Sequence, residues 1–176
     1  HNIDQKNISM AVVVQSMLEP QVSGILFTAN PVTGDRSEIM INASYGLGEA
    51  IVGGQVSPDS FILDRDELTT KETLIGSKEV EIVQSGDQGV SIRSINPDKQ
   101  AEPSMTETAL SDLARLGLHI EQLFQDVPQD IEWAIADGQI YCLQSRPITH
   151  LPVAPLKDVM WEPEYEGGKL IRRQVV

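Results

Sequence analysis

The chain has 176 residues, 40% of them hydrophobic, and its 13 basic and 26 acidic side chains give a formal net charge of −13. A surface of that sign repels a phosphate backbone, which argues against nucleic-acid binding. No apolar run approaches the roughly 20 residues of a membrane-spanning helix, the N-terminus has no signal-peptide pattern, and Cys142 is the only cysteine, so we expect a cytoplasmic globular protein that is not a membrane protein.

The first part of the chain predicts strands. Residues 10–18 and 22–30 are both apolar runs rich in β-branched side chains, and the short segment "EPQ" separates them, which predicts an antiparallel pair. The turn residues of "NPVTGDRS" follow at 30–37, where proline fixes φ and glycine supplies a positive φ. Residues 38–45 then predict a third strand.

The middle of the chain predicts shorter elements. A glycine loop, "GLGE" at 46–49, leads into one helical turn over 49–52, and residues 60–64 predict another strand. The loop has no Gly-Lys-Ser/Thr ending, so it is not a P-loop, although it could still contact a ligand. Between residues 67 and 96, short segments bounded by Gly, Ser and Asp predict a peripheral meander.

One long helix is predicted from about Thr106 to Gln125. Ser104 and Glu107 have the spacing of a capping box. Apolar or small residues then recur every three to four positions, as in a stripe that packs on a sheet; they are Leu110, Leu113, Gly117, Ile120 and Phe124.

The segment "DIEWAIADGQIYCLQSRPIT" at 130–149 predicts a hairpin. Side chains alternate between the faces of a strand, so the length of the connecting loop decides which residues of the two strands share a face. A two-residue Asp137-Gly138 turn would separate Glu132 from Gln144. We therefore expect a three-residue loop, which buries Trp133, Tyr141 and Leu143 as a unit and gathers the polar side chains on the other face.

The polar set of this hairpin suits a particular chemistry. Glu132 and Gln144 offer carboxylate and amide oxygens, the hard ligands that Mg²⁺ prefers. Arg146 projects in the same direction as Gln144 and can bind a phosphate oxygen with its two-pronged guanidinium. A plain alternative stays open: charged strands are often a solvated sheet face with a cross-strand ion pair.

The same residues closely resemble the end of the ATP-grasp nucleotide-binding domain in the phosphoenolpyruvate synthase, pyruvate phosphate dikinase and rifamycin phosphotransferase family. The resemblance extends through "MAVVVQSML", "SGILFTANPVTGDR" and "ASYGLGEAIVGGQVSPDSF" and covers about residues 8 to 150. It implies an α+β ATP-grasp subdomain, mainly an antiparallel sheet with one long backing helix. Residues 1–149 would be the C-terminal part of that domain, and residues 150–176 a linker and the start of the next.

The resemblance also implies roles for residues. Glu132 and Gln144 would hold Mg²⁺ with ATP, Arg146 would contact the ATP phosphates, and Gln15 would lie beside the nucleotide at the hinge between subdomains. Asp130 is a weaker candidate for a supporting role. No catalytic residue is assigned within the chain.

The implied reaction converts ATP to AMP and phosphate and passes a phosphoryl group through a histidine on another domain of the same chain. Its acceptor, pyruvate or a small hydroxylated molecule, would bind elsewhere in the parent protein. His1, His119 and His150 do not occupy the carrier's position in the family. The subdomain that supplies a lysine and an arginine to the phosphates would precede residue 1, so we expect the isolated chain to be inactive. The rival hypothesis is a non-catalytic nucleotide-binding or scaffold module of the same fold.

Overall fold

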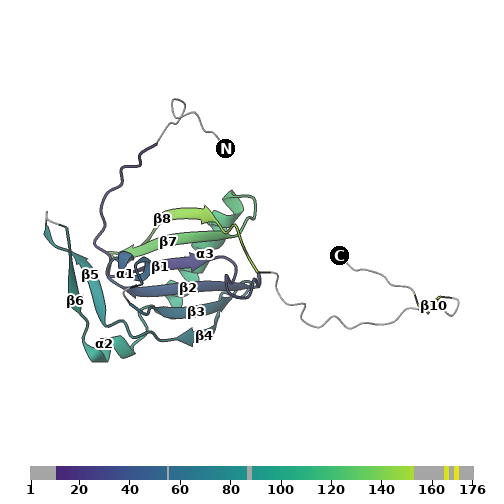
Figure 1. The fold of residues 1–176 in the computed structure, drawn as a ribbon, viewed down its shortest axis with the longest axis horizontal. Coiled ribbons are helices and arrows are strands. Elements are labelled where there is room, and N and C mark those ends of the chain that lie inside the picture. Colours follow the sequence, from purple (N-terminus) through teal and green to yellow (C-terminus); the bar gives the residue numbers. More distant parts are fainter. Residues whose placement is uncertain (1–10, 55, 87–88, 153–164, 167–168, 171–176) are drawn as a thin grey trace, which may run out of the picture.

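The computed structural model describes residues 11–54, 56–86, 89–152, 165–166 and 169–170. Six strands form one antiparallel sheet in the order β4-β3-β2-β1-β7-β8 (Figure 1). Their bounds are β1 Val22–Phe27, β2 Glu38–Tyr45, β3 Asp59–Asp64, β4 Thr70–Leu74, β7 Gln129–Ala136 and β8 Gln139–Pro147. The predicted α+β class with a mainly antiparallel sheet is confirmed.

The remaining elements are not part of this sheet. Two strands, β5 Val80–Gln84 and β6 Val90–Ser94, form a separate antiparallel arm, and β9 Tyr165–Glu166 pairs with β10 Lys169–Leu170. The helices are α1 Glu49–Val52, α2 Pro97–Ala101 and α3 Glu107–Leu123. Within the described ranges, no helix is long and apolar enough to cross a membrane.

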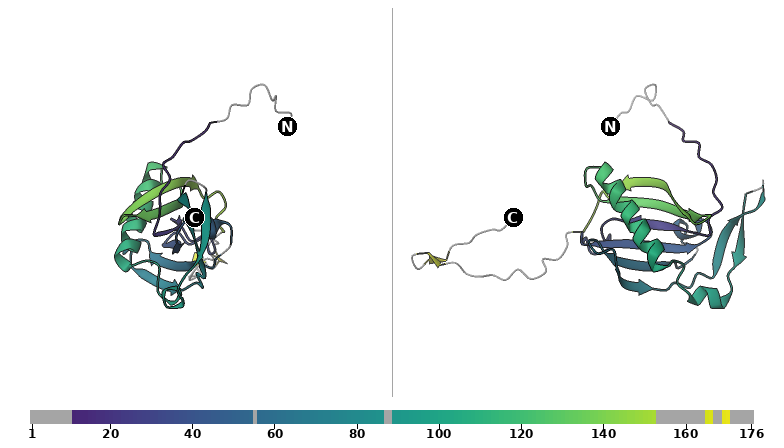
Figure 2. Two further views of the ribbon diagram at one scale, coloured as in Figure 1. Left: turned by 90° about the vertical axis from the view of Figure 1, so that its left-hand side faces the viewer. Right: turned by 180° about the vertical axis from the view of Figure 1, so that it is seen from behind.

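Helix α3 lies across one face of the sheet (Figure 2). Its buried stripe includes Leu110, Leu113 and Ile120, which join the hydrophobic core with Leu26 and Trp133 of the sheet. Gly117 allows α3 to approach β1 closely, because a Cβ atom at this position would lie 2.7 Å from Cδ2 of Leu26. The helix therefore buries one face of the sheet, and the opposite face, which α3 does not cover, is the open face.

The start of α3 differs from the predicted one. Thr106 is the N-cap, and its hydroxyl accepts a hydrogen bond from the Ala109 amide at 3.3 Å. Ser104 does not cap the helix; its amide donates to the Asp59 carboxylate at 2.7 Å. The capping-box prediction was wrong, because a long-range contact engages residue 104.

The predicted strand over residues 10–18 is also wrong for the described residues 11–18, which have no secondary structure. Strand β1 instead pairs with β2 and β7. The side chains of the valine run remain exposed, with Val12 at 78%, Val13 at 82% and Val14 at 93%. A strand needs a backbone partner as well as a β-branched sequence, and no described strand pairs its backbone with this segment.

A buried ion pair fixes the base of the β5–β6 arm. Lys78 and Asp59 are both fully buried, and the Lys78 ammonium donates to the Asp59 carboxylate. The same carboxylate accepts from the Gly76 amide at 2.9 Å and from the Ser104 amide. Since Gly76 and Lys78 precede the arm and Ser104 follows it, one carboxylate holds both of its ends.

The predicted meander over residues 67–96 is divided in two. Strand β4 is an edge of the main sheet, whereas β5 and β6 form the arm. Helix α2 was not predicted, although Asn96 caps it and Pro97 occupies its first turn. The predicted boundary after residue 149 stays a prediction, because residues 153–164, 167–168 and 171–176 of the expected linker and next domain lie outside the described residues.

Candidate functional site

The turn of the β7–β8 hairpin contains two residues. Ala136 lies opposite Gln139, and the two turn residues both have positive φ, 51° at Asp137 and 72° at Gly138. Positive φ at both central positions is the signature of a type I′ turn, which matches the twist of the two strands. The predicted three-residue loop was therefore wrong.

A β-bulge restores the pairing that the loop length alone would have removed. Cys142 lies opposite Trp133 and Gln144 lies opposite Glu132, so Leu143 is an extra residue of β8. Beyond the bulge Glu132 shares a face with Gln144, and Asp130 shares that face with Arg146. The structure thus brings together the predicted polar set by a route that the sequence analysis did not consider.

The bulge changes which apolar side chains are buried. Trp133 is fully buried as predicted, but Tyr141 lies opposite Ala134 on the polar side and is half-buried. Leu143 is 37% exposed. The expectation that Trp133, Tyr141 and Leu143 form one buried unit was wrong, because the short turn and the bulge set the faces of β8 differently along its length.

Asp130 and Arg146 form an ion pair across the two strands. The Arg146 Nε and Nη2 atoms each lie 2.8 Å from Oδ2 of Asp130. The hydrogen bond and charge of Asp130 raise the pKa of Arg146, to which the charge of Glu132 also contributes. The side chain of Arg146 is 60% exposed and that of Asp130 only 14%. Asp130 therefore orients a guanidinium that still presents donors to solvent.

The second oxygen of Asp130 is unsatisfied. Oδ1 is buried and has no hydrogen-bond partner within the part of the chain that the structure describes. A buried carboxylate oxygen without a donor or cation carries a desolvation cost. The polar end of the hairpin can accordingly accept a further donor or a cation.

The polar residues continue into a half-exposed patch of the open sheet face. Glu132 lies opposite Ile25 of β1, which lies opposite Asn42 of β2. In the next row Asp130 lies opposite Phe27, which lies opposite Met40. The side chains of this patch are neither fully buried nor fully exposed; they are Ile25, Phe27, Met40, Asn42, Asp130 and Glu132. Sequence reasoning missed the β1 and β2 members, because the pairing of distant strands places them there.

Gln15 lies beside the bulge. Its side-chain amide donates to the Leu143 carbonyl at 3.2 Å, a contact that spans 128 positions of the chain. This hydrogen bond connects the exposed N-terminal segment to strand β8 at the bulge. Gln15 thus reaches the hairpin that carries Glu132, Gln144 and Arg146, although the predicted strand around it is absent.

The glycine loop covers the other part of the open face. Ser23 donates through its hydroxyl to the Gly46 carbonyl, and Leu47 donates through its amide to the Ile82 carbonyl at 2.8 Å. Gly46 has a φ of 74°, and a Cβ atom there would lie 2.4 Å from the Ile82 carbonyl oxygen. Close packing against the arm is thus a sufficient reason for this glycine.

The donor set of the hairpin fits Mg²⁺ as a partial site. In the described ranges, no group of three or more His, Cys, Asp or Glu side chains could hold a metal ion. Glu132 and Gln144 supply one carboxylate and one amide oxygen from opposite positions, and Mg²⁺ is commonly held by one or two carboxylates together with water and phosphate oxygens. Any ion here would share its coordination with a ligand.

Two of the three histidines can be located. His119 is exposed on α3, and His150 follows β8, where its ring nitrogen lies 3.1 Å from the Thr149 hydroxyl. His1 lies outside the described residues. His150 is only four positions beyond Arg146 in the chain, and His119 is on the helix that covers the opposite face.

The chain is similar in sequence to known proteins. Residues 1–165 match the family described as "Pyruvate phosphate dikinase, AMP/ATP-binding domain". The chain is 42% identical over 159 residues to a rifampicin phosphotransferase of Bacillus cereus, covering 90% of this chain and 18% of that protein. It is 39% identical over 164 residues to a probable phosphoenolpyruvate synthase of Pyrococcus abyssi, covering 89% of this chain and 20% of that protein.

A third relative is the phosphoenolpyruvate synthase of Pyrococcus furiosus, 41% identical over 156 residues, with 84% of this chain and 19% of that protein covered. The chain thus spans about a fifth of the length of the curated relatives that it matches. The family match covers nearly the whole chain, and each relative matches most of it. The chain belongs to the pyruvate phosphate dikinase AMP/ATP-binding domain family.

Proposed function

We propose that this chain is the C-terminal part of an ATP-grasp domain and forms one wall of the Mg-ATP site of a dikinase-type phosphotransferase. The observation that carries the proposal is the pairing of Glu132 with Gln144 and of Asp130 with Arg146 on the open face of the sheet. Two adjacent rows of the hairpin thereby offer oxygen ligands for a cation and a guanidinium for phosphate oxygens.

Each residue has a defined role in the proposal. Glu132 and Gln144 hold Mg²⁺, and Arg146 binds a phosphate oxygen while Asp130 orients its guanidinium. Gln15 contacts the nucleotide from its place beside the bulge. When bound, Mg²⁺ supplies charge neutralisation at the phosphate oxygens, and the protein contributes mainly positioning.

The reaction that we propose converts ATP to AMP and phosphate. A histidine on another domain of the same polypeptide carries a phosphoryl group to a small acceptor. The relatives' names support two acceptor classes, since they include phosphoenolpyruvate synthases and rifampicin phosphotransferases. In this proposal neither His119 nor His150 is the carrier, and the chain provides no catalytic residue of its own. We also propose that the enzyme is cytoplasmic.

The proposed site is incomplete without a second wall. The patch around Ile25 and Met40 is half-exposed, and the valine run beside the bulge is almost fully exposed. Apolar surface of this kind is typical of an interaction site. We assign the opposite wall to a preceding nucleotide-binding subdomain, so the isolated chain binds ATP weakly and is inactive.

Phosphorylation of the carrier histidine tests the proposal. In a polypeptide that joins this chain to the preceding subdomain and the histidine domain, Glu132→Ala and Arg146→Ala should abolish ATP-dependent histidine phosphorylation while the protein stays folded, as far-UV circular dichroism measures. Arg115→Ala is the control, because Arg115 pairs with Asp112 on the exposed side of α3. Normal phosphorylation of both site variants would reject the assignment.

The rival function is a non-catalytic nucleotide-binding or scaffold module. Calorimetry of the same polypeptide with Mg-ATP separates the possibilities. Heat of binding together with histidine phosphorylation supports the dikinase function, whereas heat without phosphorylation indicates a binding module. A scaffold without nucleotide affinity releases no heat.

A further inference from the structure

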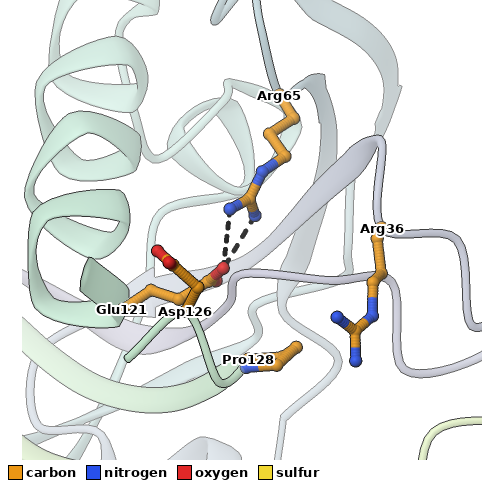
Figure 3. A pocket seen from close by; sticks show the side chains of 5 residues that line it. All are labelled: Arg36, Arg65, Glu121, Asp126 and Pro128. Carbon is orange, nitrogen blue, oxygen red and sulfur yellow. Dashed lines mark hydrogen bonds and ion pairs between the residues drawn. The ribbon is translucent and has the colours of Figure 1, made fainter. Parts of the chain in front are cut away.

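A pocket of about 230 Å³ lies at the C-terminal end of helix α3 (Figure 3). Five residues line it: Arg36, Arg65, and Glu121, Asp126 and Pro128 from the end of α3 and the turn that follows. The volume is smaller than the roughly 300–1,000 Å³ typical of sites for drug-sized ligands. The pocket therefore suits a small ligand or a single functional group.

One wall of the pocket is a fixed ion pair. Arg65 Nη2 lies 2.6 Å from Oε1 of Glu121, and Arg65 Nη1 donates to Oε2 of Glu121 at 3.3 Å (Figure 3). Arg65 Nη1 also donates to the Thr28 carbonyl at 2.7 Å. The Glu121 side chain is only 4% exposed. This two-pronged contact satisfies both charges, so neither is available to a ligand as a free charge.

Arg36 differs from the other arginines of the described ranges. Four of them pair with a carboxylate within 4.0 Å, namely Arg65, Arg93, Arg115 and Arg146. Arg36 forms no such pair within the residues that the structure describes, although acidic side chains outnumber basic ones two to one in the chain. Arg36 therefore presents to the pocket a guanidinium that no described carboxylate pairs with.

The loop that carries Arg36 is held by its own hydrogen bonds. The Asn30 side chain accepts from the Val32 and Thr33 amides at 2.9 and 3.2 Å and donates to Glu38 at 2.9 Å. The Gly34 amide donates to the Asn30 carbonyl at 2.8 Å. A backbone that is fixed in this way lowers the entropy cost of placing the guanidinium against a ligand.

Asp126 lines the pocket from the turn after α3. Its amide donates to the Glu121 carbonyl at 3.1 Å, and its backbone is left-handed, with a φ of 59°. The structure records no ion pair between Asp126 and Arg36 or any other described cation within 4.0 Å. Among the residues that the structure describes, Arg36 and Asp126 are thus a cation and an anion of the pocket that have no ion-pair partner.

We propose that this pocket binds an anionic group, a phosphate or a carboxylate, through the guanidinium of Arg36. Such an oxyanion accepts the two-pronged contact that arginine offers and that lysine cannot reproduce. Asp126 repels the same anion and keeps its affinity low. The pocket involves the end of α3, whereas Glu132 and Gln144 lie on the opposite side of the sheet, so the inference does not depend on the proposed nucleotide site.

NMR titration of the 176-residue chain tests the inference. Inorganic phosphate and acetate are added separately at constant ionic strength, and the Arg36 Nε and Gly34 amide signals are followed. Saturable shifts with either anion are expected. Saturation with phosphate alone would identify a phosphate-type ligand, saturation with acetate alone a carboxylate, and saturation with both a general oxyanion site. No saturable shift with either anion would overturn the proposal.

Four variants make the assignment specific. Arg36→Gln should weaken binding by about tenfold or more, and Arg36→Lys should weaken it less, because lysine keeps the charge but not the fork. Arg115→Gln, on the outer side of α3, should bind as the parent does. Asp126→Asn should bind the anion more tightly. Unchanged binding by Arg36→Gln, or weaker binding by Asp126→Asn, would contradict the site.

Discussion

Glu132 of β7 lies directly opposite Gln144 of β8, although the turn that joins their strands has only two residues. In a regular ladder this turn would place the two side chains on opposite faces of the sheet. The extra residue at Leu143 reverses the parity of β8 and returns Gln144 and Arg146 to the face of Glu132. The candidate site therefore depends on a bulge.

The register around the bulge can be tested by cross-linking. In a Cys142→Ser background, the pair Glu132→Cys and Gln144→Cys should form a disulfide under mild oxidation, because directly opposed Cβ atoms lie about 4.5–5.5 Å apart. The control pairs Glu132→Cys with Leu143→Cys, whose Cβ atoms do not oppose each other. Mass spectrometry measures the fraction oxidised, and equal oxidation of the two pairs would refute the register.

The type I′ turn should depend on Gly138. Gly138 has a φ of 72°, and a Cβ atom at such a position costs about 1–2 kcal/mol. Gly138→Ala should therefore lower the free energy of unfolding in urea by about that amount. Asp137→Asn, which tolerates the left-handed φ of 51°, should have little effect. Similar stability of the alanine variant and the parent would contradict a two-residue turn.

The buried ion pair at the base of the arm should contribute more than any surface pair. Lys78→Met leaves the Asp59 carboxylate buried without its cation and should lower the free energy of unfolding by about 3–5 kcal/mol. Arg93→Met removes a pair whose arginine side chain is 66% exposed and should cost at most about 1 kcal/mol. Chemical denaturation measures both variants. A smaller loss of unfolding free energy for Lys78→Met than for Arg93→Met would contradict the buried pairing.

Asp64 should titrate at unusually low pH. Its carboxylate accepts from the Glu67 amide at 3.0 Å and the Asp66 amide at 2.9 Å, and these hydrogen bonds lower its pKa below the ordinary value of about 3.8. Because the folded-state pKa is depressed, its contribution to stability is present above pH 3.8 and is lost as the pH falls through the folded value. Carboxyl-carbon NMR gives the midpoint, and a midpoint at or above 3.8 would contradict the turn geometry.

Local patterns in the sequence were sufficient for several elements. Strand β2 has the predicted bounds of residues 38–45, and α1 occupies the predicted turn over residues 49–52. Both are specified by residues within a few positions of each other. Helix α2 could have been found in the same way, since Asn96 and Pro97 form a recognisable start.

Contacts between distant residues account for the wrong predictions. The valine run at 12–14 has the composition of a strand, but strand formation also requires a neighbouring edge. Ser104 has the spacing of a cap, but its amide contacts Asp59, 45 positions away. The bulge at Leu143 has no obvious sequence signal, because Leu143 simply continues the apolar run that begins at Ile140.

The polar residues of the candidate site were named from the sequence, but the bulge that brings them to one face was not predicted. Glu132, Gln144 and Arg146 were singled out as a polar set, and their assembly on one face follows from the register. The half-exposed neighbours Ile25 and Met40 could not be assigned to that face before the pairing of β1, β2 and β7 was known. Candidate site residues can be proposed from local chemistry, whereas their neighbours on the sheet can be named only when the strand order is known.

The Mg²⁺ dependence of ATP binding tests the proposed site most directly. In a polypeptide that joins this chain to the preceding subdomain, calorimetry should show that ATP binds more tightly with Mg²⁺ than without it. Glu132→Gln should weaken Mg-ATP binding by about tenfold or more and abolish the benefit of Mg²⁺. Asp112→Asn, an exposed carboxylate of α3, is the control and should behave as the parent does. Parent-like Mg-ATP affinity in Glu132→Gln would contradict the proposed site.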